Sequence, residues 1–152
     1  MKRRLCITPC GAVKIWDKHP ELGAVPAYDA YISPFGSACH AYAKTFFDHW
    51  VILSAKHGFL RPTDLVPGNY DLAFDSKSQD IITIEALKRQ VEEKELRRFD
   101  EIVIVAGKKH TKVIRAVFGD HCTYRFPLQG CKGIGYMLQR LNKAIKEKKE
   151  IE

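Results

Sequence analysis

Nucleophilic and titratable residues stand directly after two apolar runs of this sequence. Cys10 follows the first run, and Ser54, Lys56 and His57 follow the end of the run WVIL. A thiol beside a lysine can act as a nucleophile, because the positive charge lowers the pKa of the thiol. Histidine titrates near neutral pH and can exchange protons with a substrate. We therefore predict Cys10, Lys56 and His57 as catalytic residues, with Lys109 as another charge partner for the thiol. The alternative for Cys10 is a purely structural role, because cysteine is often a small buried apolar residue.

A glycine followed by basic residues comes after a third apolar run, EIVIVA. This segment opens a predicted helix, and the free N–H groups at a helix start favour an anion. We predict that Gly107, Lys109 and His110, together with Ser54, hold a phosphate or a ribose. A plain strand-to-helix turn with Thr111 as its N-cap explains the same residues equally well.

Two further segments supply candidate ligand-binding residues. Tyr70 and Asp71 lie in a stretch rich in Pro and Gly and could orient a base or ribose, although Asp also commonly starts turns. Gly130 and Gly133 would let the backbone approach a ligand closely, or simply permit a tight turn into the last helix. The glycines form neither a P-loop nor a full G-x-G-x-x-G pattern. No motif specifies a cofactor, which stays unknown, and without a paired His or Cys spacing we expect no metal.

These residues can meet only if the surrounding elements bring their loops together. Continuous apolar runs predict strands, and apolar residues at steps of three and four predict helices. The predicted strands are 3–8, 50–54, 101–106 and 122–126, the predicted helices are 36–48, 78–98, 110–118 and 133–148, and the segments 11–35 and 58–77 are predicted to be irregular. The alternation implies an α/β fold, a Rossmann-like three-layer sandwich with a mainly parallel sheet of four or five strands. Ligands bind outside the carboxyl ends of such strands, so we expect the loops to share one pocket.

Composition limits the class of protein. The 152 residues suit a single domain, which we place over 1–152, and 45% hydrophobic and 28% charged residues are ordinary for a globular chain. No apolar run approaches the roughly 20 residues that cross a bilayer, and the first residues lack the apolar stretch of a signal peptide. Five unpatterned cysteines indicate free thiols, so we expect a cytoplasmic protein that makes no membrane contact. The net charge of +7 suits an anionic partner such as a nucleotide or nucleic acid, although part of it lies in the lysine-rich end. Nothing indicates an oligomeric state.

Several stretches together resemble a known family. They are TPC at 8–10, YISP at 31–34, ILSAKHGFL at 52–60, YDL at 70–72 and PL-x-G-x-x-GIG at 127–135. The pattern is similar to a widespread family of small bacterial and archaeal proteins, itself distantly similar to the peroxide-stress protein YaaA and to the catalytic domain of archaeosine synthase. The resemblance implies DNA binding or modification of a base in nucleic acid, and it adds Ser33 to the predicted ligand-binding residues. After the first strand, Pro9, Cys10, Ala12 and Lys14 match archaeosine synthase, whereas Gly11 stands where that enzyme has a serine.

These observations lead to three hypotheses of function. The first is an enzyme that acts on a nucleotide or nucleic-acid base, by base modification or by N-glycosyl or other group transfer, in a pocket at the C-terminal ends of the strands. The second is a noncatalytic, basic nucleic-acid-binding module of a stress response. The third is a hydrolase or transferase of a phosphorylated metabolite. Salt dependence separates the first two, because binding to a phosphate-binding surface weakens steeply as salt rises.

Overall fold

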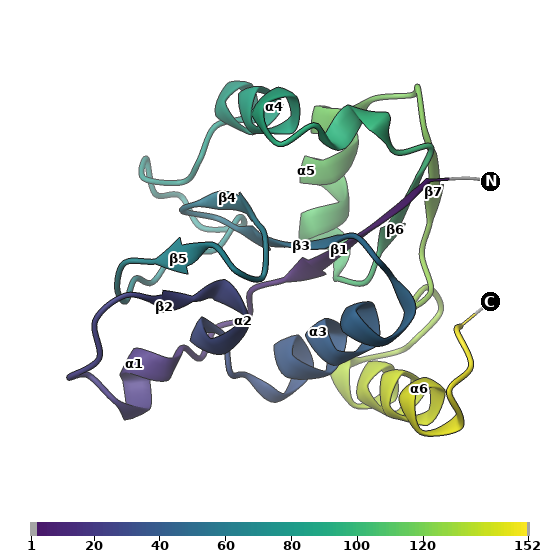
Figure 1. The fold of residues 1–152 in the computed structure, drawn as a ribbon, viewed down its shortest axis with the longest axis horizontal. Helices are drawn as coiled ribbons and strands as arrows, with labels where there is room; N and C mark the ends of the chain where they lie inside the picture. Colours follow the sequence, from purple (N-terminus) through teal and green to yellow (C-terminus); the bar gives the residue numbers. More distant parts are fainter. Residues whose placement is uncertain (1–2, 152) are drawn as a thin grey trace.

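The structure is a computed structural model that describes residues 3–151. Helices and strands alternate along the chain, as Figure 1 shows. In chain order they are β1 (Arg4–Pro9), α1 (Ile15–Lys18), β2 (Val25–Pro26), α2 (Ala27–Ala30), α3 (Pro34–Phe46), β3 (Trp50–Ser54), β4 (Gly58–Leu60), β5 (Leu65–Val66), α4 (Ile84–Glu93), the 3-10 helix η1 (Leu96–Arg98), β6 (Glu101–Ile104), α5 (Lys108–Phe118), β7 (Thr123–Arg125) and α6 (Ile134–Glu147). In the described part of the chain, no helix has the length and apolar character needed to cross a membrane.

Five strands form one sheet in the order β4-β3-β1-β6-β7. The central strand, β1, pairs in parallel with β3 on one side and with β6 on the other. β7 pairs in parallel with β6, and β4 is antiparallel to β3 at the opposite edge. The prediction of an α/β fold with a mainly parallel sheet is therefore confirmed.

Helices lie on both faces of this sheet. Leu5 and Ile7 of β1 pack with Leu87 of α4 and Ile114 of α5. Cys6, between them in the sequence, packs on the other face with residues of α3 and α6. Figure 1 shows α4 and α5 on one side of the strands and α3 and α6 on the other. Strands that are covered on both faces are apolar at successive positions, which is why their sequences could be recognised.

The segments predicted to be irregular contain short elements. α1, α2, β2, β4 and β5 all lie within 11–35 or 58–77, and β2 pairs with β5 in a separate antiparallel sheet. Their side chains form a third apolar cluster that includes Trp16, Tyr31 and Val66. Elements of two to four residues are too short to show a hydrophobic period, so the sequence pattern could not reveal them.

The helix predicted over 78–98 is shorter in the structure. Thr83 caps α4, because its Oγ1 accepts a hydrogen bond from the N–H of Ala86 at 3.1 Å. At the other end Glu95 takes the left-handed conformation, with φ of 57°, which separates α4 from η1. The apolar residue Ile81 therefore precedes the helix instead of lying on its face.

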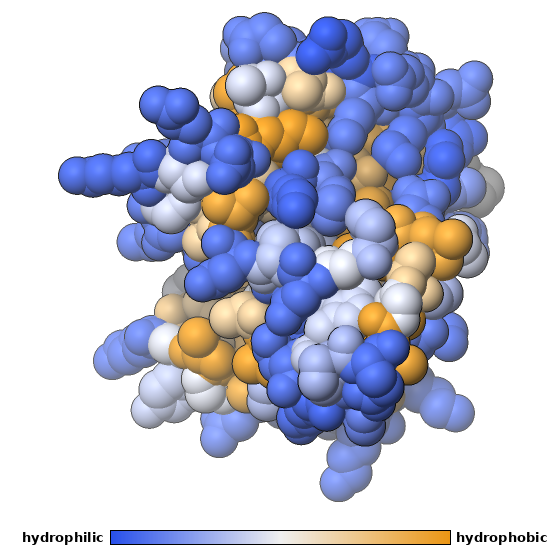
Figure 2. Space-filling model, turned by 90° about the vertical axis from the view of Figure 1, so that its left-hand side faces the viewer, coloured by the Kyte–Doolittle hydropathy of each residue, from blue (hydrophilic) through white to orange (hydrophobic). Residues whose placement is uncertain are grey.

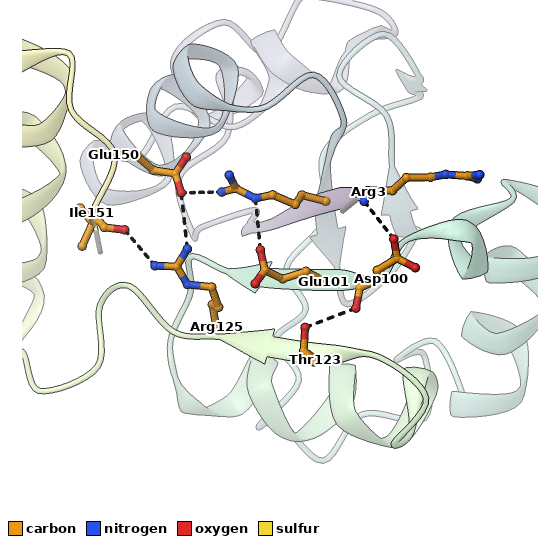
Figure 3. Close-up of polar contacts among 8 residues, drawn as sticks. Arg3, Asp100, Glu101, Thr123, Arg125, Glu150 and Ile151 are labelled. Carbon is orange, nitrogen blue, oxygen red and sulfur yellow. Dashed lines mark hydrogen bonds and ion pairs between the residues drawn. The ribbon is translucent and has the colours of Figure 1, made fainter. Parts of the chain in front are cut away.

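The last described residues pack against β1 and β7, and Figure 3 shows Glu150 and Ile151 beside Arg125. The carboxylate of Glu150 pairs with Arg4 of β1 and with Arg125 of β7, the latter at 3.8 Å. The N–H of Ile151 donates to the hydroxyl of Tyr42 in α3 at 3.0 Å. These contacts fix the last described residues beside the first residue of β1, the last residue of β7 and α3.

Candidate functional site

A pocket of about 610 Å³ lies at the carboxyl ends of β1 and β6. The chain leaves β1 toward α3 on one face of the sheet and leaves β6 toward α5 on the other, so the two loops diverge. Open α/β sheets bind ligands at such switch points. The walls come from the loops after β1 and β6, the segment 71–74 and the start of α6. Figure 2 views the molecule from the side to which β1 points in Figure 1, and apolar side chains lie there in patches among polar ones.

Cys10 lines this pocket and is 8% exposed. Burial raises the pKa of its thiol above the ordinary value, and this outweighs the lowering by the ammonium groups of Lys14 and Lys109 and by backbone N–H groups. Lys14 has the larger effect of the two lysines, and Lys56 is not among the groups that shift this pKa. The charge partners of the thiol are therefore Lys14 and then Lys109, and the resting thiol is protonated.

Lys14 is a buried cation in the pocket wall, with 3% of the residue exposed. Its Nζ donates to the carbonyl oxygen of Ala12 at 3.3 Å and lies 4.4 Å from the centroid of the Tyr70 ring. Within residues 3–151, no carboxylate oxygen lies within 4.0 Å of this nitrogen. A buried ammonium group has three donors and requires partners for them. Sequence reasoning did not select Lys14 as a site residue, and the predicted resemblance to archaeosine synthase, which includes this position, was the one signal that pointed to it.

The loop after β1 is packed closely against the start of α3. Gly11 has φ of +81°, and a Cβ at this position would lie 2.1 Å from the Oγ of Ser33. Ser33 lines the pocket and precedes α3 as its N-cap residue, with Pro34 in the first turn. Nε2 of His40 donates to the carbonyl oxygen of Pro9 at 2.8 Å, and burial lowers the pKa of this histidine. A serine at position 11 would not fit beside Ser33, which explains the glycine.

Ser54 is buried and is not one of the residues that line the pocket. Its Oγ accepts hydrogen bonds from the N–H groups of Lys56, at 3.2 Å, and His57, at 3.1 Å. It also forms a hydrogen bond with the hydroxyl of Tyr70 at 2.5 Å, and the Tyr70 hydroxyl forms a second one with the hydroxyl of Tyr31. Burial raises the pKa of Tyr70 strongly and that of Tyr31 to about 12, so both phenols are neutral. Ser54 therefore closes the turn between β3 and β4 and anchors Tyr70.

Lys56 and His57 occupy this turn, and neither lines the pocket that contains Cys10. Lys56 is exposed, with its Nζ 5.6 Å from the centroid of the Tyr70 ring. The ring of His57 meets the Tyr70 ring edge-on at a centroid distance of 5.1 Å. Burial and then the charge of Lys56 lower the pKa of His57. The structure places both residues next to Tyr70 and outside the lining of the pocket that contains Cys10. Their catalytic role stays a prediction.

Lys109 and His110 reach the pocket from the first turn of α5. His110 is 5% exposed, and its ring packs edge-on against Phe74 at a centroid distance of 5.6 Å. In the described residues its Nδ1 has no hydrogen-bond partner. Burial and then Lys109 lower the pKa of His110 to about 4, while Asp75 opposes this shift. The pocket thus holds a neutral imidazole whose Nδ1 lacks a hydrogen-bond partner among the described residues. The predicted ligand-binding residue Asp71 lines the same pocket.

The predicted glycines fall in different places. Gly107 lines the pocket and is the N-cap residue of α5, which begins at Lys108. Thr111 lies inside the helix, so the alternative that made it the N-cap is wrong. Gly130, with φ of +90°, lines a second cavity beside the first. Gly133 is not among the residues that line either cavity and comes immediately before α6.

The cysteines are distributed over the fold. All five are free thiols, and Cys6 and Cys39 are buried in the core next to α3. Cys122 and Cys131 are half-buried, close to β7 and in the second cavity. Between residues 3 and 151, no group of three or more His, Cys, Asp or Glu side chains lies close enough together to hold a metal ion.

Comparison with known proteins finds a relative that is similar over nearly the whole chain and a distantly similar solved structure. The chain is 56% identical over 149 residues to "Uncharacterized protein YfjM" of Bacillus subtilis (strain 168), which covers 98% of this chain and 99% of that protein. The crystal structure of AF0587, a protein of unknown function, is similar with a TM-score of 0.41 and 15% identity, over 98% of this chain and 46% of that chain. None of the matches supports the similarity to YaaA or archaeosine synthase, which stays a prediction. The sequence pattern of DUF6884, described as a family of unknown function, matches residues 16–143, and the chain therefore belongs to this family.

Proposed function

We propose that the pocket binds a nucleotide or a nucleic-acid base, and that the protein is an enzyme that modifies or transfers this base. The observation that carries the proposal is the buried ammonium group of Lys14 in an otherwise largely apolar pocket at the switch point of the sheet. A base has flat apolar faces and oxygen and nitrogen acceptors at its edge, so it suits both features. The volume of about 610 Å³ lies within the roughly 300–1,000 Å³ of small-molecule sites. This arrangement also favours a single Rossmann-like three-layer domain, which we infer for the chain.

Different walls of the pocket suit different parts of such a ligand. Phe35 and Phe74 offer apolar surfaces to the faces of the base. Lys14 would donate to a carbonyl oxygen or an anionic edge of the base. Lys109, at the start of α5, would meet a phosphate, because the ammonium group and the helix N-terminus both favour negative charge. The neutral ring of His110 would form one hydrogen bond with the edge of the base.

Cys10 is the nucleophile in the proposed reaction. The simplest first step is addition of its thiol to an electron-poor C=N bond of the base. A sulfur–carbon bond forms, and the ring nitrogen takes the released electron pair and the proton of the thiol. The Lys14 ammonium group favours the thiolate during this step, because it stabilises negative charge on the sulfur.

Thermal denaturation with candidate ligands tests the proposal. The ligands are nucleotides, nucleosides, free deazaguanine bases and short oligonucleotides, each at low and moderate salt. A ligand at about 100 times its Kd should stabilise the fold by about 2.7 kcal/mol. We expect Lys14→Met to abolish the shift caused by a base or nucleoside, and the matched variant Lys18→Met, which changes an exposed lysine, to keep it. A shift that survives in Lys14→Met, or no shift with any base-containing ligand, contradicts the proposal.

The enzymatic part of the proposal is tested with the ligand found in this way. Mass spectrometry of the incubated ligand should show a product with the wild-type protein and none with Cys10→Ala. Cys122→Ala is the matched control, because this half-buried thiol lines neither cavity, and the activity of this variant should be unchanged. A Cys10→Ala variant that folds and still forms product removes Cys10 from the mechanism.

A noncatalytic nucleic-acid-binding module is the second candidate function. It is favoured by the exposed basic residues Lys108, Lys112 and Arg115 around the second cavity. Such a module would be stabilised by oligonucleotides alone, and the effect would disappear as salt rises and be unchanged in Lys14→Met.

A further inference from the structure

The second cavity, of about 520 Å³, lies between α5 and the segment that follows β7. Gly107 and Met137 line both cavities, so the two adjoin. We call the second one the α5 groove, lined among others by Lys108, Thr111, Lys112, Arg115, Phe126 and Gln129.

The charged residues of the α5 groove are all cationic. Lys108, Lys112 and Arg115 line it, and no Asp or Glu in the described part of the chain does. Steps of four and three residues place them along one side of α5, over about 10 Å of helix. None of the three forms an ion pair within 4.0 Å in residues 3–151. A row of like charges without acidic partners favours an anionic ligand with more than one charge.

Arg115 packs against two aromatic rings beside the groove. Its guanidinium carbon lies 4.8 Å from the centroid of the Tyr124 ring and 5.2 Å from that of Phe126. The two rings are stacked at an interplanar angle of 21°, and the hydroxyl of Tyr124 donates to the carbonyl oxygen of Gly119 at 2.5 Å. A guanidinium that packs on rings keeps its N–H groups available for bidentate contact with a phosphate.

We infer that the α5 groove binds the phosphate backbone of a nucleic-acid strand whose unpaired base occupies the first pocket. The inference rests on the proposed function and narrows its substrate to a strand. The phosphate of a mononucleotide would be met by Lys109 inside the first pocket, whereas the row of cations along α5 extends beyond it and suits the neighbouring phosphates of a strand. A base can enter a pocket of this kind only from a single strand or after leaving the stack of a duplex.

The test compares the binding of a nucleoside with that of a short single-stranded oligonucleotide of the same base. The groove variant is Lys108→Gln combined with Lys112→Gln and Arg115→Gln. The control variant combines Lys143→Gln, Lys146→Gln and Lys149→Gln. It removes the same charge from exposed lysines in the C-terminal part of α6 and just after it.

We expect the wild type and the control variant to bind the oligonucleotide about tenfold or more tightly than the nucleoside at low salt, with the difference falling as salt rises. The groove variant should lose this difference and keep its affinity for the nucleoside. A difference that survives in the groove variant overturns the inference, and so does equal affinity of the wild type for both ligands. If no nucleoside binds the wild type, the proposed function fails. The groove is then tested by the affinity for the oligonucleotide alone. An equal loss of this affinity in the groove variant and the control variant shows that the α5 groove is not a local binding site.

Discussion

Two residues in the loop after β1, Gly11 and Lys14, decide the shape and the charge of this side of the pocket. Gly11 takes φ of +81°, and the Oγ of Ser33 fills the space that a side chain at this position would need. Lys14, three residues further on, brings an ammonium group into the pocket with 3% of the residue exposed. The path of the chain from Cys10 to Lys14 therefore depends on a glycine, since a β-carbon is strained at positive φ.

We expect Gly11→Ala to lower the free energy of unfolding by about 1–3 kcal/mol, because it adds both backbone strain and an overlap with Ser33. Urea denaturation measures this change. Gly23→Ala is the matched control, since nothing lies within 4 Å of its Cβ position, and it should stay within about 0.5 kcal/mol of the wild type. Equal stability of the two variants would contradict the view that Ser33 and the backbone fix this loop.

Sequence reasoning identified much of the pocket because it searched directly after the strands. Cys10 and His110 follow β1 and β6, and the structure places both in one pocket. It selected Ser54 as well, but it did not predict that Ser54 lies outside this pocket, because the antiparallel strand β4 has three residues and leaves no period in the sequence. It passed over Lys14 as a site residue, because lysines are rarely buried and the sequence alone does not show where one is.

The hairpin of β3 and β4 depends on a side chain of α4. The amide of Gln90 accepts from the N–H of Phe59 and donates to the carbonyl oxygen of His57, each at 2.8 Å. Gly58, between them, has φ of +76°, and a Cβ there would lie 2.1 Å from the Oε1 of Gln90. The turn that Ser54 closes is thus fixed from α4 as well as from the sheet.

We expect Gln90→Leu to lower the free energy of unfolding by about 2–4 kcal/mol, because it leaves two backbone groups of the turn without partners. Gln139→Leu, at an exposed position of α6, is the control and should change stability by less than about 0.5 kcal/mol. Hydrogen exchange gives a local measure, since the amide of Phe59 should exchange faster in Gln90→Leu. An unchanged exchange rate would show that the turn does not rely on this glutamine.

The molecule as a whole keeps several histidines neutral. Burial is the main cause that lowers the pKa of His40, His57 and His110 from the ordinary value of 6.5, to about 4 for His110. They lie in different parts of the fold, on α3, in the β3–β4 turn and on α5. Protonation of any of them therefore favours the unfolded chain.

Stability should follow this linkage as pH changes. Below about 6.5 the unfolded chain binds protons that the folded chain excludes, so the free energy of unfolding should fall as pH decreases toward about 4. His110 alone should account for about 1–2 kcal/mol between pH 7 and pH 5. We expect His110→Gln to reduce this fall, and His121→Gln, at an exposed position, to leave it unchanged; urea denaturation at several pH values measures both. Equal slopes in all three proteins would show that His110 titrates normally.

The central position of β1 has a consequence for how the chain is made. Among the strands of this sheet β1 is synthesised first, and its two neighbours, β3 and β6, begin only at Trp50 and Glu101. A chain emerges from the ribosome with its N-terminus first, so the backbone groups of β1 that pair with β6 have no partner until β6 has been translated. The incomplete sheet exposes unpaired backbone groups and apolar side chains during this interval, and pairing between segments so distant in sequence is slow. We therefore expect the growing chain to be most exposed to aggregation before β6 emerges.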